Sequence, residues 1–451
     1  MVTPLIWNMH YGDSLVCECD VWLRSACVRE TFYKEHDGKR YCVLHYPGIE
    51  KKEEFQKALE WKLSQGDFDF SGVWFPEAVS FKKLTFSAAA DFGCAKFSAN
   101  ANFDGAQFSA DATFDSAEFN ESAFFGEVQF GAEANFNLAQ FNSAFFGGAV
   151  FNGTATFQRT NFIEKVGSPG RSVNSNNKAI SINDKGGEKT RTLVYFDRVR
   201  FKDGVSFEKN MFAGHAQLSF DAAVFEKPER VTFHTVALRP HWFFNVDSRK
   251  LNFINVDWGE LHRWDAVSKE IKALESKYIA NTPRLMAITF RQLAVNAEEN
   301  NRYEEAANFR YMAMDARRIE RGFIENLFSL GWWYWALSGY GERVWRAFVA
   351  LLVIWLLFAV FYWSGNATWW QPKQASKVAA ESNAGEKQPS AVAQPLTIPD
   401  ALIYSLGVMA LQKPEPLPAN KRAKGLVLLE TILGPFQAAL LALAIRRKFM
   451  R

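Results

Sequence analysis

The chain has 451 residues, with 52 Lys and Arg against 49 Asp and Glu, which gives a formal net charge of +3. This length is too great for a single domain, and so small a net charge gives no indication of a nucleic-acid partner. The charge is unevenly distributed, because residues 67–162 are rich in Asp and Glu whereas the C-terminal half is basic. The first residues, MVTPLIWNMHYGD, lack a basic start and an apolar run, so we expect no secretory signal peptide.

Cysteine and histidine are concentrated near the N-terminus. Four of the five cysteines lie in the first 42 residues, and Cys42 and His45 form a C-x2-H step. Two ligands at this spacing can bind one metal ion, and a segment this short can hardly fold without such a staple. We therefore predict a cap over residues 1–60 with a structural zinc site of Cys3His type. The alternatives are free thiols or disulfides, of which the latter need an oxidising compartment. The candidate ligands are Cys17, Cys19, Cys27, Cys42 and His45.

Phenylalanine then recurs with alternating gaps of five and six residues. A small or aliphatic residue stands two positions before nearly every Phe, and Gly, Ser, Asp or Asn usually follows it. This period matches neither a helix nor a long strand, but it fits short extended segments that turn a corner after each Phe. The small residue and the Phe point to the same side, so both should face the axis of a solenoid whose coils cover one another. The regular ladder comprises Phe70, Phe75, Phe81, Phe86, Phe92, Phe97, Phe103, Phe108, Phe114, Phe119, Phe125, Phe130, Phe136, Phe141, Phe146, Phe151, Phe157 and Phe162.

A second, less regular stretch of the ladder runs from Phe196 to Phe253, and Trp258 closes it. Between the two stretches, residues 164–192 are rich in Gly, Ser, Asn and Lys, which is typical of an exposed loop. This loop is either a tolerated insertion or a contact site. We predict one solenoid over residues 68–258 with the insertion at 164–192. An ordinary β-sandwich is the alternative, but its turns come about every 8–12 residues.

The repeat resembles that of the pentapeptide-repeat family, whose consensus is a small residue, any residue, Leu or Phe, and two polar residues. Here the motif is Phe-rich and carries an extra residue in alternate repeats. The resemblance implies a right-handed quadrilateral β-helix and says little about function. Some members of this family mimic DNA with an acidic face. The modest charge density of this chain argues against that role, and we expect no nucleic-acid partner.

Helical periodicity replaces the Phe ladder after Trp258. Apolar residues recur at intervals of three and four along residues 261–274 and again along 293–312, so we predict a helical connector over residues 259–342. The second of these stretches resembles a single tetratricopeptide-like helix hairpin. Such a hairpin would supply either a peptide-binding groove or a cap for the open end of the solenoid.

Two further segments, residues 344–363 and 425–445, are long and apolar enough to cross a bilayer. Clusters of arginine and lysine precede the first segment and follow the second. Because positive charge collects on the cytoplasmic side, we predict a multi-pass protein of the cell inner membrane with cytoplasmic N- and C-termini. Residues 343–451 would then form a two-span transmembrane module with an external loop over residues 366–424.

The end of this loop, IPDALIYSLGVMALQKPEPLP, resembles the pore helix of the two-helix potassium-channel pore module. Potassium selectivity uses a TVGYG loop whose backbone carbonyls replace the hydration shell of the ion. This chain has MALQKP at the corresponding place, and Lys413 would repel cations. The sequence therefore argues against potassium selectivity and favours a degenerate pore domain, used either for nonselective conduction or only as an anchor.

Two features of the second span bear on such a pore. Glu430 is a carboxylate within an apolar segment, which indicates function by default, although a position close to the wet outer interface would also explain it. Gly434 precedes Pro435, and this pair predicts a kink that would serve as a gating hinge or as a packing contact. The pore candidates are Ser405, Met409, Gln412, Lys413, Glu430 and Gly434.

The sequence contains no phosphate-binding loop, dinucleotide fingerprint, nucleophile elbow or HExxH motif, so we do not expect an enzyme. The first functional hypothesis is a gated ion-conducting pore of relaxed selectivity, which would be a homo-oligomer in the lipid bilayer with a cytosolic β-helix as its sensor. The alternative is a membrane-anchored protein-interaction scaffold without conduction, whose protein partner binds the β-helix. The predicted fold is thus mainly a β solenoid, with a helical connector, two transmembrane helices and a small zinc-binding-like cap.

Overall fold

The computed structural model describes residues 17–18, 32–162, 172–173, 179–180, 193–212, 217–261, 263, 265–275, 282–320, 325, 329–371 and 394–449. The chain divides into two compact units, Met1–Asn300 and Asn301–Arg451. The boundary between the units falls within residues 293–312, so the two halves of the predicted tetratricopeptide-like hairpin belong to different units.

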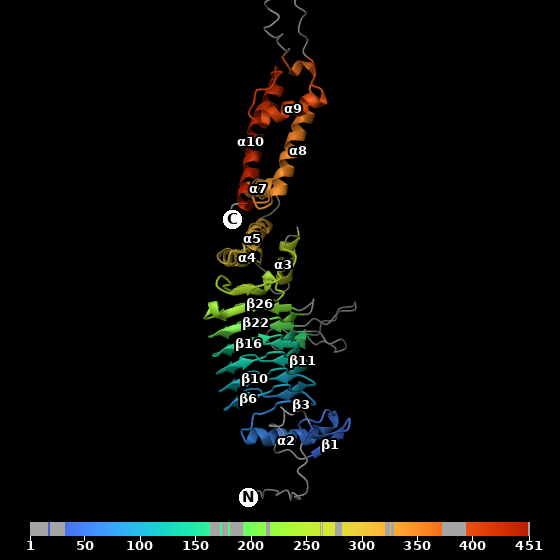
Figure 1. Ribbon diagram of the computed structural model, residues 1–451, viewed down its shortest axis with the longest axis vertical. Coiled ribbons are helices and arrows are strands. Elements are labelled where there is room, and N and C mark those ends of the chain that lie inside the picture. Colours follow the sequence, from blue (N-terminus) through green and yellow to red (C-terminus); the bar gives the residue numbers. More distant parts are fainter. Residues whose placement is uncertain are drawn as a thin grey trace, which may run out of the picture. The chain divides into compact units, whose positions relative to one another are not determined.

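The first unit contains a parallel β-solenoid of about seven turns, whose stacked coils are marked by β6, β10, β16, β22 and β26 in Figure 1. Each strand pairs with the equivalent strand one coil away, so Ala112 lies opposite both Ala90 and Ala134. A seven-stranded sheet comprises β6 (Ala90–Asp91), β10 (Ala112–Thr113), β13 (Ala134–Asn135), β16 (Ala155–Gln158), β22 (Val205–Glu208), β26 (Val231–His234) and β27 (Asn252–Ile254). A six-stranded sheet comprises β5 (Thr85–Phe86), β9 (Gln107–Phe108), β12 (Gln129–Phe130), β15 (Val150–Phe151), β21 (Arg200–Phe201) and β25 (Val224–Phe225).

A ten-stranded sheet completes the solenoid. Its main path comprises β3 (Trp74–Phe75), β7 (Lys96–Phe97), β11 (Glu118–Phe124), β14 (Gln140–Phe145), β17 (Asn161–Phe162) and β23 (Met211–Phe212). A second column joins it through the longer strands β11 and β14, and its other members are β4 (Val79–Ser80), β8 (Ala101–Asn102), β20 (Leu193–Tyr195) and β24 (Gln217–Ser219). Within the predicted insertion 164–192, only the antiparallel pair β18 (Ser172–Val173) and β19 (Ala179–Ile180) lies among the described residues.

Phenylalanine fills the interior of this solenoid, as the spacing predicts. Phe114 is fully buried and stacks on Phe136 of the next coil, with ring centroids 4.9 Å apart and planes 2° from parallel. Ala112 is buried on the same side, whereas Thr113 between them is turned outward and partly exposed. Burial of one such side chain contributes about 1.5–3 kcal/mol, and the repeat supplies it in every coil. The regular Phe spacing is thus confirmed as the repeat of a solenoid.

The gaps of five and six residues correspond to two kinds of corner. In the five-residue gaps the backbone is left-handed two positions after the Phe, and the Phe81 carbonyl, for example, accepts a hydrogen bond from the Leu84 N–H at 3.0 Å. The residue pattern predicted the turn at the Gly, Ser, Asp or Asn directly after each Phe. In these corners the left-handed residue is the next one, and it is often not glycine. Examples are Lys83, Cys94, Ser116, Glu127 and Leu138.

Both ends of the solenoid are covered within the first unit. At the N-terminal end stand the hairpin of β1 (Phe32–His36) and β2 (Lys39–Cys42), the short helix η2 (Ile49–Lys51) and α2 (Lys52–Ser64), whose Phe55 packs edge-on against Phe75. At the other end lie η3 (Pro228–Arg230), η4 (Pro240–Phe243), α3 (Ala266–Glu275) and α4 (Thr282–Glu299). There the buried Asn296 amide donates to the carbonyls of Ser248, Arg249 and Leu251 at 2.7–3.0 Å. The last backbone carbonyls of the solenoid thereby find a donor.

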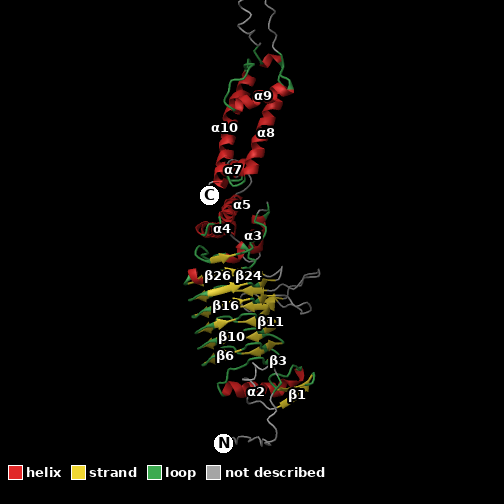
Figure 2. Ribbon diagram, viewed as in Figure 1, coloured by secondary structure: helices red, strands yellow, loops and turns green. Residues whose placement is uncertain are grey.

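The second unit is helical. Its elements are α5 (Tyr303–Glu320), α7 (Leu330–Ser338), α8 (Val344–Trp363), η5 (Ala367–Trp369), α9 (Ile398–Met409) and α10 (Lys421–Phe449). Figure 2 shows α8 and α10 side by side, with α9 packed near one end of the pair and α7 at the other. Helices α8 and α10 contain the two predicted spans and are long and apolar enough to cross a membrane. In each, only 17% of the most apolar window is buried, so neither resembles the core helix of a soluble protein.

Candidate functional site

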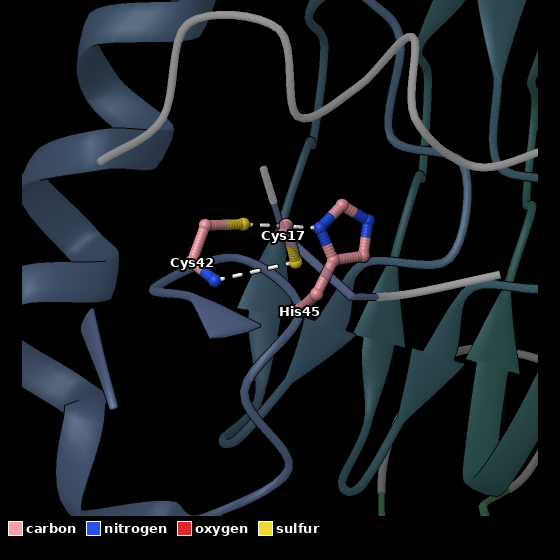
Figure 3. A group of neighbouring side chains, drawn as sticks. All are labelled: Cys17, Cys42 and His45. Atoms are coloured by element: carbon pink, nitrogen blue, oxygen red, sulfur yellow. Dashed lines mark hydrogen bonds between the residues drawn. The ribbon is translucent and has the colours of Figure 1, made fainter. Parts of the chain in front are cut away.

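The first candidate site is a thiol and imidazole cluster in the N-terminal cap (Figure 3). Cys17, Cys42 and His45 are all buried, and their ligand atoms lie within 4.8 Å of one another. The Cys42 Sγ is 3.1 Å from His45 Nδ1, and the Cys42 N–H donates to Cys17 Sγ at 3.3 Å. Residue 17 reaches this position because the next residue, Glu18, pairs with β2 through a 2.7 Å backbone hydrogen bond to Arg40. These three residues could hold a metal ion.

The first coil of the solenoid sets the orientation of the imidazole ring. His45 Nε2 lies 2.9 Å from the Ser71 carbonyl oxygen, which can only accept a hydrogen bond, so Nε2 carries the proton. The neutral ring then presents the lone pair of Nδ1 to the two sulfurs, which is the arrangement of a histidine ligand held by an outer hydrogen bond. Burial by itself lowers the pKa of His45. The hydrogen bonds to Cys17 and Cys42 have the opposite and larger combined effect, so the pKa is raised to about 10.

The structure brings together only some of the predicted ligands. Cys17, Cys42 and His45 come together, whereas Cys19 and Cys27 lie outside the described residues. No disulfide links the described cysteines, and Cys94 is exposed at a solenoid corner, away from the cluster. Two sulfurs and one ring nitrogen fit three positions of a tetrahedral zinc site, and a closed site needs a fourth ligand.

A buried lysine that no sequence pattern indicated stands beside this cluster. Lys51 is fully buried, its ammonium donates to the Leu44 carbonyl at 2.8 Å, and it lies over the Phe55 ring. Burial lowers the pKa of Lys51 to about 7, and the nearby Cys42 sulfur acts in the opposite direction. A cation at this place would offset part of the negative charge of thiolate ligands. The surrounding residues, IEKKEE, gave no signal, because such a run usually forms a solvated face.

The second candidate site is a buried carboxylate in the helical unit. Glu430 of α10 is fully buried and accepts two hydrogen bonds from hydroxyl groups on the neighbouring helices. Tyr362 of α8 donates at 2.6 Å, and Ser405 of α9 donates to the other carboxylate oxygen. Ser405 also contacts the Trp355 carbonyl of α8 at 3.2 Å. One carboxylate thus joins three helices, and it is not exposed at a wet surface.

Aromatic rings surround this carboxylate. Tyr404 of α9 packs at 5.0 Å from both Tyr362 and Trp370, and Phe358 belongs to the same buried cluster. The chain around Trp370 also pairs with the segment after α9, because the Gln371 N–H donates to the Leu417 carbonyl at 2.8 Å. Apolar surroundings strengthen the hydrogen bonds to a buried polar group. The short helix α9 is therefore fixed against α8 and α10 along its buried face.

The remaining pore candidates separate into two groups. Gly434 lies against α9, so that a Cβ atom added there would stand only 2.8 Å from Met409 Cγ. This contact joins Met409 and Gly434 to the region of Ser405 and Glu430. Gln412 and Lys413, by contrast, are exposed in the turn after α9. Helix α10 continues through Pro435.

Helix α10 has a further buried polar residue, Gln437, which is not among the predicted pore candidates. Gln437 is fully buried and its amide donates to the carbonyls of Leu337 at 3.0 Å and Ala347 at 2.8 Å. It lies three residues, or just under one helical turn, beyond Gly434 and inside the predicted span. An amide within an apolar segment was the available signal, since polar groups in such segments usually have partners.

No family model, curated protein or solved structure matches this chain. The assignment of a function therefore depends on the contacts described above.

Proposed function

We propose that this protein is a membrane-anchored solenoid whose helical unit forms an ion-conducting pore of relaxed selectivity. The observation that carries the proposal is the position of α9. Its 12 residues are too few to span a bilayer, yet Glu430, through Tyr362 and Ser405, holds it between two helices that are apolar enough to do so. A short helix held between two spans is the plan of a re-entrant pore loop, in which non-helical backbone can line a water-filled path.

The composition of the turn after α9 supports relaxed selectivity. This turn contains Gln412 and Lys413, both exposed, and it has no glycine that would permit a ring of backbone carbonyls of the kind used for potassium. A pore lined by these side chains would pass small ions without strong selection and would disfavour divalent cations. Conduction requires several copies of the chain around one axis, so we propose a homo-oligomer.

The proposed topology follows the charges that flank the helices. Arg343 and Arg346 stand at the start of α8, and Arg446, Arg447 and Lys448 at the end of α10. Positive flanks favour the cytoplasmic side, so we place both termini and the solenoid in the cytoplasm and the 366–424 loop outside, in the inner membrane of a bacterial-type cell. The solenoid would then act as the sensor of the pore.

Ion flux from liposomes that contain the purified full-length protein tests the pore. The variant Ser405→Ala removes one hydrogen bond to the Glu430 carboxylate and should change the flux severalfold, since a bond to a charged group contributes about 1.5–3 kcal/mol. Thr431→Val is the matched control, because the Thr431 hydroxyl bonds only within its own helix, to the Val427 carbonyl at 2.7 Å. An oligomer that is folded and silent in this assay would rule out conduction and leave the helical unit as an anchor.

A scaffold without conduction is the second candidate, and one feature of the solenoid favours it. Outward-facing aromatic residues follow one column of the ten-stranded sheet: Phe124 and Phe145 stack at 5.2 Å, and Tyr195 follows at 5.7 Å. All three are only partly buried. Aromatic residues enriched on a surface are typical of protein interfaces. In that case the wild-type chain should give no ion flux, and replacement of Phe145 by Ser should abolish capture of the partner.

We further propose that the cap binds one structural zinc ion through Cys17, Cys42, His45 and one of Cys19 or Cys27. The orientation of Nδ1 toward two sulfurs supports this proposal. Elemental analysis of the purified chain should give one zinc per chain, Cys42→Ser should lose it, and Cys94→Ser should keep it. Because structural zinc stabilises its domain by roughly 10 kcal/mol or more, chelation should unfold the cap. A protein free of zinc with both thiols titratable would disprove the site.

The geometry of a right-handed, four-sided β-helix, as in pentapeptide-repeat proteins, is also part of the proposal. The seven-stranded and six-stranded sheets, together with the two columns of the ten-stranded sheet, support four sides.

A further inference from the structure

A cleft of about 340 Å³ lies between α7 and α10. Leu330, Tyr334 and Leu337 line it from α7, and Phe436 and Leu440 line it from α10. The three α7 residues are spaced four and three positions apart, so they share one face of the helix. The wall of the cleft is almost entirely carbon, and its volume is near the lower end of the range of about 300–1,000 Å³ for small-ligand sites.

The cleft is a built feature of the helix packing. Gln437 fixes the C-terminal end of α7 against α10 and α8 through its hydrogen bonds to the Leu337 and Ala347 carbonyls. At the N-terminal end of α7, Gly331 contributes no side chain, and a Cβ atom added there would meet only Ser329 Oγ, at 3.6 Å. The neighbouring Trp333 is half exposed. An apolar space thus stays open beside a helix that carries aromatic residues of the kind found at membrane interfaces.

A guanidinium group lies close to the Tyr334 side of this cleft. The Tyr334 hydroxyl and Arg447 Nη1 lie 2.7 Å and 3.3 Å from the point that a Cβ of Gly341 would occupy. Arg447 donates to the Tyr340 carbonyl at 3.0 Å and stands 3.7 Å from Glu342. Further cations of the same unit lie on the adjoining segments, and two of them, Arg318 and Arg346, lie over the Trp335 ring at 4.2 Å and 4.3 Å. The described cations of this region include Arg310, Arg318, Arg343, Arg346, Arg446, Arg447 and Lys448. Its carboxylates include Asp315 and Glu342, and Glu342 also lies 3.6 Å from Arg310.

We propose that this cleft binds one acyl chain of an anionic phospholipid, whose phosphate lies at Arg447. The apolar wall provides the contact for hydrocarbon, and the excess of arginine and lysine provides the complementary charge. Basic pockets between transmembrane helices on the cytoplasmic side are suited to anionic headgroups. The inference rests on the membrane placement proposed above, which puts α7 at the cytoplasmic interface, and it does not depend on conduction.

Native mass spectrometry of the full-length protein in neutral detergent tests the site, with dioleoyl phosphatidylglycerol and dioleoyl phosphatidylcholine as probes. The two lipids have the same acyl chains, so a difference in occupancy reports the headgroup. The wild-type chain should bind phosphatidylglycerol at least about fivefold more tightly, since one basic residue near an anionic lipid contributes about 1 kcal/mol. Arg447→Gln should remove most of this preference.

Two substitutions that fill the cleft test the acyl-chain contact. Leu440→Trp fills it from α10 and Gly331→Leu from α7, and both should lower phosphatidylglycerol binding about tenfold or more. Leu443→Trp is the matched control, because Leu443 is partly exposed on the same helix and does not line the cleft. The melting temperature of each variant in detergent shows whether the fold is retained, and the two filling variants are independent of each other.

Each outcome decides one proposal. Equal binding of the two lipids by the wild-type chain, or full binding by both filling variants, would overturn the lipid site. The wild-type chain could instead bind no lipid and form a dimer that Leu440→Trp dissociates. That result would assign the cleft to a contact between subunits and would also overturn the lipid site. Recovery of the wild-type chain in the soluble fraction of cells lysed without detergent would instead overturn the membrane placement.

Discussion

The solenoid and the helices α7–α10 are stabilised in different ways. In the solenoid one contact repeats from coil to coil: Phe108 stacks on Phe130 just as Phe114 stacks on Phe136. In α7–α10 the buried polar contacts differ from one another, and those of Glu430 and Gln437 each occur once. A repeat spreads stability over many equivalent contacts and confines damage to neighbouring coils. A bundle that depends on single buried polar contacts is more sensitive to the loss of any one of them.

The largest effect expected is the loss of a stacked ring in the solenoid. Phe108→Ala removes a buried side chain that stacks at 4.5 Å on Phe86 and at 5.1 Å on Phe130, and it should cost about 3–5 kcal/mol of unfolding free energy. Gln107→Ala, at the exposed neighbouring position, should change it by less than about 0.5 kcal/mol. Hydrogen exchange measured by mass spectrometry on the full chain should show faster opening of the adjoining coils.

The same hydrogen-exchange measurement tests whether the solenoid confines damage to neighbouring coils. Protection of α8 and α10 should be unchanged in Phe108→Ala if the solenoid behaves as a series of nearest-neighbour contacts. Loss of protection in α10 comparable with that in the adjoining coils would mean that the repeat does not confine damage.

A pair of glycines in α10 gives the next largest effect. Gly434→Ala places a Cβ atom 2.8 Å from Met409 Cγ and 3.2 Å from its Cα, so α9 must move, at a cost of about 1–3 kcal/mol. Gly425→Ala meets no atom within 4 Å and should stabilise the helix by up to about 1 kcal/mol, because alanine favours helix over glycine. Thermal unfolding in detergent measures both. Equal melting temperatures for the two variants would show that the α9–α10 contact is loose and would favour a hinge at Gly434.

The sequence predicted the solenoid well because one signal, the Phe spacing, repeats in every coil. The left-handed corners were not predicted from the sequence, because residues such as Lys83 and Leu138 rarely adopt a positive φ. The stacking of the coils imposes this backbone conformation on them. Local spacing likewise found Cys42 and His45. That Cys17 joins them depends on pairing with β2, a contact between residues distant in the chain.

The contacts of Glu430 illustrate the same limit. The sequence identified it as a carboxylate in an apolar span, but Tyr362 stands 68 residues before it and Ser405 stands 25 residues before it. Neither separation is a period of helix or strand, so only the packing of α8, α9 and α10 brings these groups together. Gln412 and Lys413 were predicted as pore residues from the same segment as Ser405, but they lie in an exposed turn.

The smallest effect expected is at the outward face of the solenoid. Burial raises the pKa of Asp91, as do the carboxylates of Asp69 and Asp115, and a hydrogen bond from the Gly93 N–H acts in the opposite direction. Asn135, two coils further along the same column, makes the equivalent bond to the Asn137 N–H at 2.9 Å with a neutral side chain. Asp91→Asn should therefore keep this bond and lose only the charge.

The sign of the pH dependence follows from the raised pKa. A carboxyl whose pKa is higher in the folded chain binds its proton more tightly there, so it favours folding below the unfolded pKa and this advantage is lost as the pH rises through the folded pKa. Asp91→Asn should thus match the wild type near about pH 3 and become more stable between about pH 3 and pH 6. The Asp91 side chain is only partly desolvated and remains exposed enough for solvent to screen its charge. The gain at pH 7 should therefore be about 0.2–0.5 kcal/mol. Denaturation of both chains across this pH range would measure the difference in unfolding free energy. If the wild type instead gained stability over the variant with rising pH, the Gly93 hydrogen bond to the ionised carboxylate would outweigh the burial and the neighbouring charges.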